Sequence, residues 1–330
     1  MGKQMIPVTD GSRYIPYEMR SGNESIVYFT RDLSAEGLLK VYDKVSACLS
    51  GKIGIKLHTG EPKGPNIIPR PWVKELIQER LPEATILETN TFYKGERYTT
   101  EQHRKTLEIN GWDFAPVDIM DEDGTEMYPV SGGKWFTEMS VGDHMKNYDS
   151  MLTLTHFKGH TMGGFGGSNK NIGIGCADGR IGKGMIHAKN GNDWGVNNEE
   201  LMEKIAESTK ATIDHFGKKV TYINVMRNMS VSCDCEGVGA MPVVTPNVGI
   251  LGSTDILAID QACIDLIFAM EEKDNAAFTE RVTTRHGLRQ LTYMKELGMG
   301  NDRYVLIDLD NDEVRICAKE AVKHVVPFEG

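Results

Sequence analysis

The stretch HFKGHTMGGFGGSNKN, residues 156–171, gathers chemically capable side chains on a glycine-rich backbone. It holds two histidines and two lysines among five glycines, directly after the apolar-leaning run MLTLT at 151–155. Glycines let backbone N–H groups approach a ligand closely, and lysines supply positive charge. This pattern is typical of a phosphate or carboxylate site, with solvated loop lysines as the plain alternative. The candidate anion-binding residues are Lys158, Gly166, Gly167, Lys170, Asn171 and Lys183.

His156 and His160 are four residues apart, a spacing at which two imidazoles can grip one metal ion on a helix. Gly159 and the glycines that follow argue against a helix here. We therefore predict metal ligation or acid–base work for at least one of the two histidines. The alternative is that one is a hydrogen-bonding turn residue and the other is exposed.

Cys233 and Cys235 flank Asp234 in the sequence CDCEG. Thiolates at positions i and i+2 of a turn can contact one metal ion, although C-x-x-C is the commoner chelate. The alternatives are a thiol pair with redox chemistry and two buried structural cysteines. Further donors would join this site if the fold brought them close: Cys176, His187 and His58. The candidate catalytic residues are Lys158, His160, Lys170 and Asp234.

The composition excludes some classes of protein. The chain has 330 residues, of which 40% are hydrophobic and 25% charged, with a net charge of −10. Enough apolar material is present for a large core, whereas general binding to nucleic acid needs clustered basic residues. The sequence contains no apolar stretch of about 18 residues and no apolar segment near its start, so neither a membrane helix nor a secretory signal is expected. We predict a cytoplasmic protein.

Apolar runs and amphipathic runs alternate along the chain, and this rhythm predicts the elements that position these residues. The predicted strands are 25–30, 52–58, 84–90, 114–121, 151–156, 220–226, 248–255 and 302–310. The predicted helices are 34–49, 71–81, 99–112, 198–216, 256–272 and 285–300. Residues 159–191 are predicted to form an ordered loop system. The alternation favours a three-layer α/β fold with a mainly parallel sheet and helices on both faces.

Polar clusters follow four of the predicted strands. They are KLHTGEPKGPN, ETNTFYKGER, HFKGH and NMSVSCDCEG, and they contribute His58 and Asn90 as further candidate ligand-binding residues. In open α/β sheets, ligands bind beyond the carboxyl ends of the strands. We therefore expect the site to lie at that edge of the sheet.

Several motifs together resemble those of the DUF362 family, whose members are often labelled uncharacterised Fe–S centre proteins. They are K-x-H at 158–160, K-N at 170–171, G-K-x-x-x-H at 182–187, C-D-C at 233–235 and the run from Gly249 to Ala262. The resemblance implies an α/β domain over 25–330 after an N-terminal extension over 1–24. Two lobes, about 25–150 and 151–330, are an alternative. Many relatives carry an inserted ferredoxin-like module after G-K-x-x-x-H, and this chain has no cysteine at that point.

The site residues predict a metal- or Fe–S-dependent enzyme acting on a small anionic substrate, with redox chemistry favoured over hydrolysis. One alternative is a metal-free enzyme or binding protein for a phosphate-bearing ligand. Another is a non-catalytic metal carrier. The cofactor expected is a transition metal or an Fe–S cluster, and the further partners considered are a redox protein and a second copy of the chain. The sequence leaves open whether the protein is an enzyme.

Overall fold

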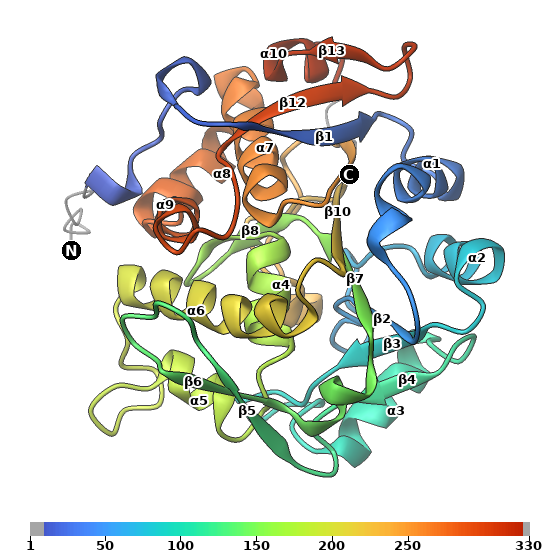
Figure 1. Ribbon diagram of the computed structural model, residues 1–330, viewed down its shortest axis with the longest axis vertical. Helices are drawn as coiled ribbons and strands as arrows, with labels where there is room; N and C mark the ends of the chain where they lie inside the picture. The colour runs from blue at the N-terminus through green and yellow to red at the C-terminus, as the bar shows by residue number, and fades with distance from the viewer. Residues whose placement is uncertain (1–9, 326–330) are drawn as a thin grey trace.

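A single large sheet organises the computed structural model, which describes residues 10–325 (Figure 1). Its strands are β1 (Glu24–Thr30), β2 (Ile53–Lys56), β3 (Thr85–Glu88), β4 (Val117–Ile119), β7 (Ser150–His156), β10 (Val220–Met226), β11 (Gly249–Ser253), β12 (Arg303–Asp308) and β13 (Val314–Ile316). Their order across the nine-stranded sheet is β13-β12-β1-β11-β10-β7-β2-β3-β4. Only β11 and β13 pair antiparallel to their neighbours, so the prediction of a mainly parallel sheet is confirmed. Both predicted lobes contribute strands to this one sheet.

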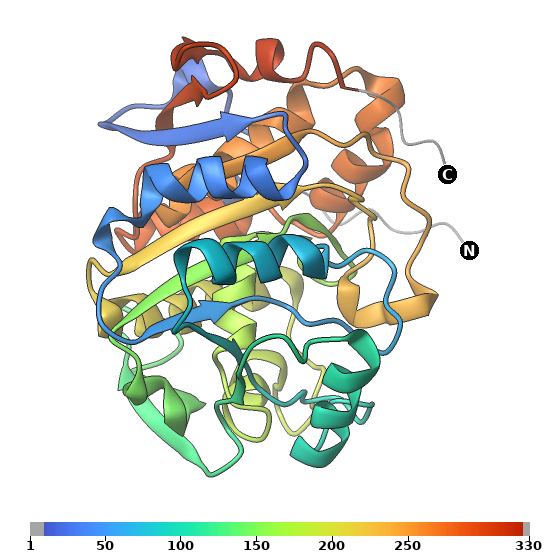
Figure 2. The same ribbon diagram turned by 90° about the vertical axis from the view of Figure 1, so that its right-hand side faces the viewer.

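Helices cover both faces of the sheet, as predicted (Figure 2). One face packs against α1 (Ala35–Val45), α2 (Arg70–Arg80) and α3 (Thr100–Asn110). On the other side, α4 (Ser168–Gly175) and α7 (Ile256–Ala269) pack against the sheet. The remaining helices on that side share their apolar core; they are α5 (Gly182–His187), α6 (Asn198–Phe216), α8 (Glu272–Thr284), α9 (Arg289–Glu296) and α10 (Ala318–Ala321). Each face has its own apolar core, which gives the three layers. Among residues 10–325, no helix has both the length and the apolar character needed to cross a membrane.

The two central strands, β7 and β10, are buried along their whole length. They are buried because helices cover both sides of the sheet at this point. These two strands pair in parallel from Val220 opposite Met151 to Val225 opposite His156. Their carboxyl ends therefore finish at the same level, and the polar segments that follow them start side by side.

The glycine-rich segment 159–191 differs from its prediction as a loop system. It contains two helices, α4 and α5, and part of a small hairpin formed by β8 (Lys158–His160) and β9 (Gly164–Gly166). The hairpin of β5 (Thr125–Pro129) and β6 (Glu138–Gly142) and the helix α8 were also not predicted. Glycine lowers the helix propensity of α4, so local sequence argued against a helix that tertiary contacts stabilise.

Asp260 of α7 provides the decisive contact for α4. Its carboxylate accepts hydrogen bonds from the backbone N–H groups of Ser168 at 2.8 Å and Asn169 at 2.9 Å, and from the side chain of Asn224 at 2.8 Å. A Cβ atom at Gly167 would come within 2.4 Å of this carboxylate, so the approach requires glycine. Burial raises the pKa of Asp260 to about 6, although these hydrogen bonds oppose the rise.

We predict that Asp260→Asn lowers the free energy of unfolding by roughly 3 kcal/mol, because the amide cannot accept all three hydrogen bonds in a buried setting. Urea unfolding followed by circular dichroism at neutral pH measures this change. Asp214→Asn is the matched control, since Asp214 pairs with Lys210 at the surface and should change stability by less than about 0.5 kcal/mol. Equal unfolding midpoints for Asp260→Asn and wild type would contradict the assigned role.

Candidate functional site

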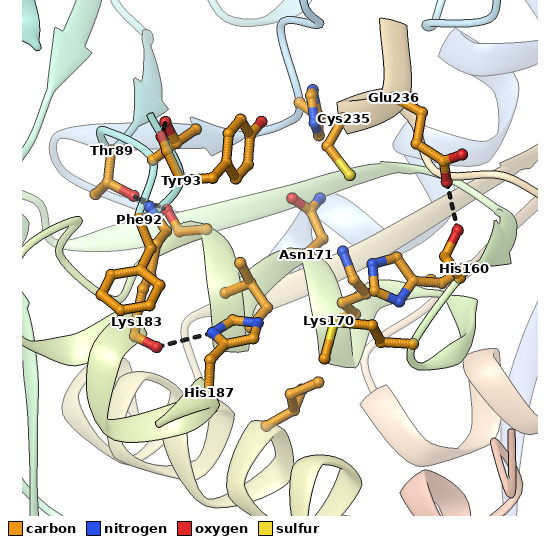
Figure 3. Close-up of a pocket in the computed structure, with 18 of the residues that line it drawn as sticks. Thr89, Phe92, Tyr93, His160, Lys170, Asn171, Lys183, His187, Cys235 and Glu236 are labelled. Atoms are coloured by element: carbon orange, nitrogen blue, oxygen red, sulfur yellow. Dashed lines mark hydrogen bonds between the residues drawn. The ribbon is translucent and has the colours of Figure 1, made fainter. Parts of the chain in front are cut away.

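A cavity of about 440 Å³ lies at the carboxyl edge of the sheet. The strands β10, β7, β2 and β3 are consecutive in the sheet, so the four polar segments that follow them meet here. Figure 3 shows residues of these segments and of α4 and α5 around the cavity. The expectation that distant polar segments converge at this edge is therefore met by the fold.

One imidazole and two thiols form a close group beside the cavity. The candidate ligand atoms of His160, Cys233 and Cys235 all lie within 4.8 Å of one another. Cys235 lines the cavity, and Cys233 is buried just behind it. The ammonium group of Lys170, on α4, donates to the Cys233 sulfur at 3.7 Å. These four residues come from three separate segments of the chain.

The two thiols differ in their electrostatics although only one residue separates them. A hydrogen bond from Cys235, the charge of Lys170 and a hydrogen bond from His160 hold the pKa of Cys233 well below its usual value, against the effect of burial. The pKa of Cys235 is raised, because it shares that hydrogen bond with Cys233 and is buried beside its negative charge. The two thiols therefore differ in acidity, and Cys233 is the one that ionises more readily.

His160 is oriented by the backbone of the loop that follows it. Its Nδ1 atom accepts a hydrogen bond from the N–H group of Gly163 at 2.7 Å. Nδ1 therefore carries a lone pair, and in a neutral ring the proton is on Nε2. Burial and the nearby charge of Lys170 lower the pKa of His160, which keeps the ring neutral.

Asp234 lies beneath the two cysteines and anchors their turn, η5 (Asp234–Gly239). Its carboxylate meets Nδ1 of His156 at 2.9 Å and Nζ of Lys158 at 3.0 Å. Nε2 of His156 lies 2.6 Å from the carbonyl oxygen of Arg227. Both ring nitrogens of His156 are thus engaged, so the structure places this histidine as a support of the turn and outside the donor group. Asp234 likewise supports the site from below the cavity.

A second buried charge network closes another side of the cavity. The carboxylate of Glu88, at the end of β3, contacts Nζ of Lys56 at 3.0 Å and accepts from Thr59 at 2.8 Å. Arg97 pairs with Glu61 at 2.8 Å and hydrogen bonds to Tyr93 at 3.0 Å. The sequence interpretation missed Glu88, Lys56 and Arg97. The signal for Lys56 and Glu88 was a charged residue inside each of two apolar strands, KIGIKLH and ATILETN, and Arg97 lies in the polar segment after the second strand.

Lys183 lies in the wall of the cavity between the two networks. Its ammonium group donates to Thr89 Oγ1 at 2.7 Å and to the carbonyl oxygen of Asn90. Burial, helped by the positive charges of Arg97 and Lys56, lowers the pKa of Lys183 to about 8. Within residues 10–325, neither Lys183 nor Lys170 forms an ion pair with a carboxylate.

His187 also lines the cavity, and Figure 3 shows it beside Phe92. Its Nδ1 atom donates to the carbonyl oxygen of Lys183 at 2.8 Å. Burial lowers the pKa of His187 to about 4, so the ring is neutral. It stands apart from the thiols and is not one of the close donor group.

The remaining predicted residues fall into two groups. Gly166, Gly167, His58 and Asn171 line the cavity. Asn171 also ties α4 to the sheet by donating to Leu154 O and Thr155 Oγ1, and burial lowers the pKa of His58 to about 3. Asn90 and Cys176 do not line the cavity. Burial raises the pKa of the Cys176 thiol to about 11, and the residue packs in the apolar core.

A second group of possible metal ligands, Asp118, Glu122 and His144, lies away from this cavity. The ring nitrogens of His144 already meet Asp118 at 2.8 Å and Asp123 at 2.9 Å. Glu122 pairs with Arg104. These partners account for the group as a surface charge cluster.

Two solved structures resemble the fold at low sequence identity. The lactate racemase apoprotein of Thermoanaerobacterium thermosaccharolyticum is 11% identical with a TM-score of 0.40, over 94% of this chain and 88% of that one. A Thermotoga maritima protein from a structural genomics programme is 14% identical with a TM-score of 0.39, over 77% of this chain and 57% of that one. We infer no activity from these similarities. A search of curated proteins finds no match.

The sequence match to a family model is more extensive. The model of DUF362, described as a domain of unknown function, matches residues 53–265. This range includes the donor group of His160, Cys233 and Cys235 as well as Lys170 and Lys183. Because it spans more than half of the protein, the chain belongs to the DUF362 family.

Proposed function

We propose that this protein is a metal-dependent enzyme that acts on a small organic anion in the cavity at the sheet edge. The observation that carries the proposal is the joint placement of His160, Cys233 and Cys235 within 4.8 Å of one another, beside Lys170. Ligand atoms of this kind suit a transition metal, and a cationic neighbour suits a negatively charged substrate.

The donor group fits a single metal ion better than a cluster. Two thiols and one imidazole are fewer than the four protein ligands that iron–sulfur clusters usually take. Catalytic metal sites commonly use three protein ligands and leave one position for water or substrate. The cavity beside Cys235 provides space for that fourth ligand. A bound zinc ion would supply Lewis acidity, and iron or copper would supply a redox couple.

Two lysines would bind the anion. Lys170 and Lys183 both line the cavity, and neither is neutralised by a carboxylate within residues 10–325. By contrast, Lys158 pairs with Asp234, and Lys56 pairs with Glu88. Lys170 faces the Cys233 sulfur, whereas the ammonium group of Lys183 contacts only the neutral oxygens of Thr89 and Asn90, so Lys183 leaves the cavity with positive charge that a carboxylate or phosphate would balance. In a partly enclosed cavity such contacts are stronger than in water.

A second candidate function is metal-free thiol chemistry. The N–H group of Gly163 bonds to Nδ1 of His160, which places the proton of the neutral ring on Nε2. An imidazole that ligates a metal normally donates a hydrogen bond from its other ring nitrogen, whereas Nδ1 of His160 accepts one. This arrangement favours His160 as a hydrogen-bond donor, through Nε2, to the Cys233 thiolate. In that case Cys233 would be the more acidic member of a redox pair whose cavity-lining member is Cys235.

The metal site is tested by elemental analysis of protein purified without chelators under argon. We predict about one transition-metal ion per chain in the wild type, because the three donors suit one ion. The double variant Cys233→Ser/Cys235→Ser should lose the metal. The matched control is Cys317→Ser, which changes an exposed thiol and should retain full occupancy. A metal-free wild type that is alkylated rapidly and selectively at the Cys233–Cys235 pair would instead support the thiol function.

Anion binding should depend on pH through Lys183. The Lys183 ammonium is charged below its pKa of about 8, so affinity for sulfate should fall as pH rises from 7 to about 9. Lys183→Met should bind sulfate at least about tenfold more weakly at pH 7 and lose this part of the pH dependence. Isothermal titration calorimetry measures both effects.

Lys273→Met is the control for this experiment, since Lys273 pairs with Glu271 at an exposed site. It should bind sulfate as the wild type does at every pH. A wild-type affinity that stays constant between pH 7 and 9 would exclude Lys183 as the anion-binding group.

A further inference from the structure

The cavity has an aromatic end whose chemistry the proposed function does not use. Phe92, His187 and Trp194 line it and come from three different segments: the loop after β3, the end of α5 and the loop before α6. The ring centroids of Phe92 and Trp194 are 5.3 Å apart, and those of His187 and Trp194 are 5.0 Å apart. Leu201 and Ile205 of α6 continue this apolar wall.

Trp194 is only partly covered by this packing. Its exposed fraction is 45%, which is large for an indole that also lines a cavity. Exposed aromatic surface in a concave setting is typical of ligand contact, because burying it against another ring is favourable. The side chain is therefore placed to cover a ligand from the open side of the cavity.

His187 adds one directed polar group to the aromatic end. Its Nδ1 atom donates to the carbonyl oxygen of Lys183, so the neutral ring presents a lone pair on Nε2. Figure 3 shows this second nitrogen directed toward the middle of the cavity. Within residues 10–325 it has no hydrogen-bond partner, although the side chain is only 8% exposed. Because this acceptor faces the open space of the cavity, it can take a hydrogen bond from a ligand donor.

We propose that the anion bound here is an aromatic acid that carries an O–H or N–H group on its ring. The acid group would meet Lys170 and Lys183, the ring would pack against Phe92 and Trp194, and the ring donor would bond to His187 Nε2. One cavity of about 440 Å³ contains all five residues, so a single ligand can contact both ends. This inference rests on the proposed function for the anion-binding end, but it requires neither turnover nor a metal.

The test compares three monoanionic probes by isothermal titration calorimetry on the protein as purified. They are 4-hydroxybenzoate, benzoate and cyclohexanecarboxylate, which differ stepwise in the ring donor and in aromaticity. We expect 4-hydroxybenzoate to bind most tightly, benzoate about threefold to tenfold more weakly, and cyclohexanecarboxylate weaker again by a similar factor.

Three variants assign these preferences to residues. Trp194→Leu and Phe92→Leu should remove most of the advantage of benzoate over cyclohexanecarboxylate. His187→Phe keeps a ring but removes the acceptor, so it should abolish the preference for 4-hydroxybenzoate over benzoate. The control is Trp72→Phe, since Trp72 contacts Arg227 away from the cavity, and it should leave all three affinities unchanged. Thermal melts confirm that each variant is folded.

The outcomes separate this inference from the proposed function. Equal affinities for benzoate and cyclohexanecarboxylate, or no binding of 4-hydroxybenzoate at millimolar concentration, would overturn the inference even if metal is present. Preferences that persist in Trp194→Leu and Phe92→Leu would overturn it as well. Conversely, the predicted order of affinities in a protein that holds no metal would support the inference while removing the metal-dependent function.

Discussion

The Asp234 carboxylate is the contact on which the site depends. It lies between the two cysteines in sequence, and its partners His156 and Lys158 come from the end of β7 and from β8. A buried carboxylate without partners would be costly, so the three groups hold one another in place. These fixed positions bring the two sulfur atoms close to His160, because His160 is only two residues after Lys158 in the chain. One ion-paired carboxylate thus links the thiols to the sheet.

The same rule explains how so many charges are buried at one edge. Glu88 is balanced by Lys56, Glu61 by Arg97, and Asp260 by the first N–H groups of α4. Each of these contacts connects segments that are far apart in sequence, so the polar edge also holds the fold together. Lys170 and Lys183 are the exceptions, because they lack carboxylate partners within residues 10–325. Lys170 contacts the Cys233 sulfur instead, whereas Lys183 contacts only neutral oxygens, so a ligand is the natural source of its compensating charge.

Much of the fold could be predicted because its elements have strong local signals. The predicted helix 198–216 and strand 220–226 match α6 and β10 residue for residue. These segments bury regular apolar faces, so hydrophobic periodicity identifies them. The helix α4 could not be predicted in this way, since its glycines disfavour a helix and its cap, Asp260, lies 92 residues away from Ser168. The charged network of Glu88 was missed because a strand pattern hides single polar residues at its end.

The sequence by itself determined the class of fold, the edge at which the site lies and the chemical types of its side chains. Strand and helix periods are local, and the carboxyl ends of parallel strands necessarily share one edge. Only the tertiary structure decided which residues meet: His160 joins Cys233 and Cys235, whereas His156 supports the turn, Cys176 enters the core and His187 faces an aromatic wall. Distances between segments far apart in the chain depend on packing and on the pairing of buried charges, and neither is encoded in local spacing.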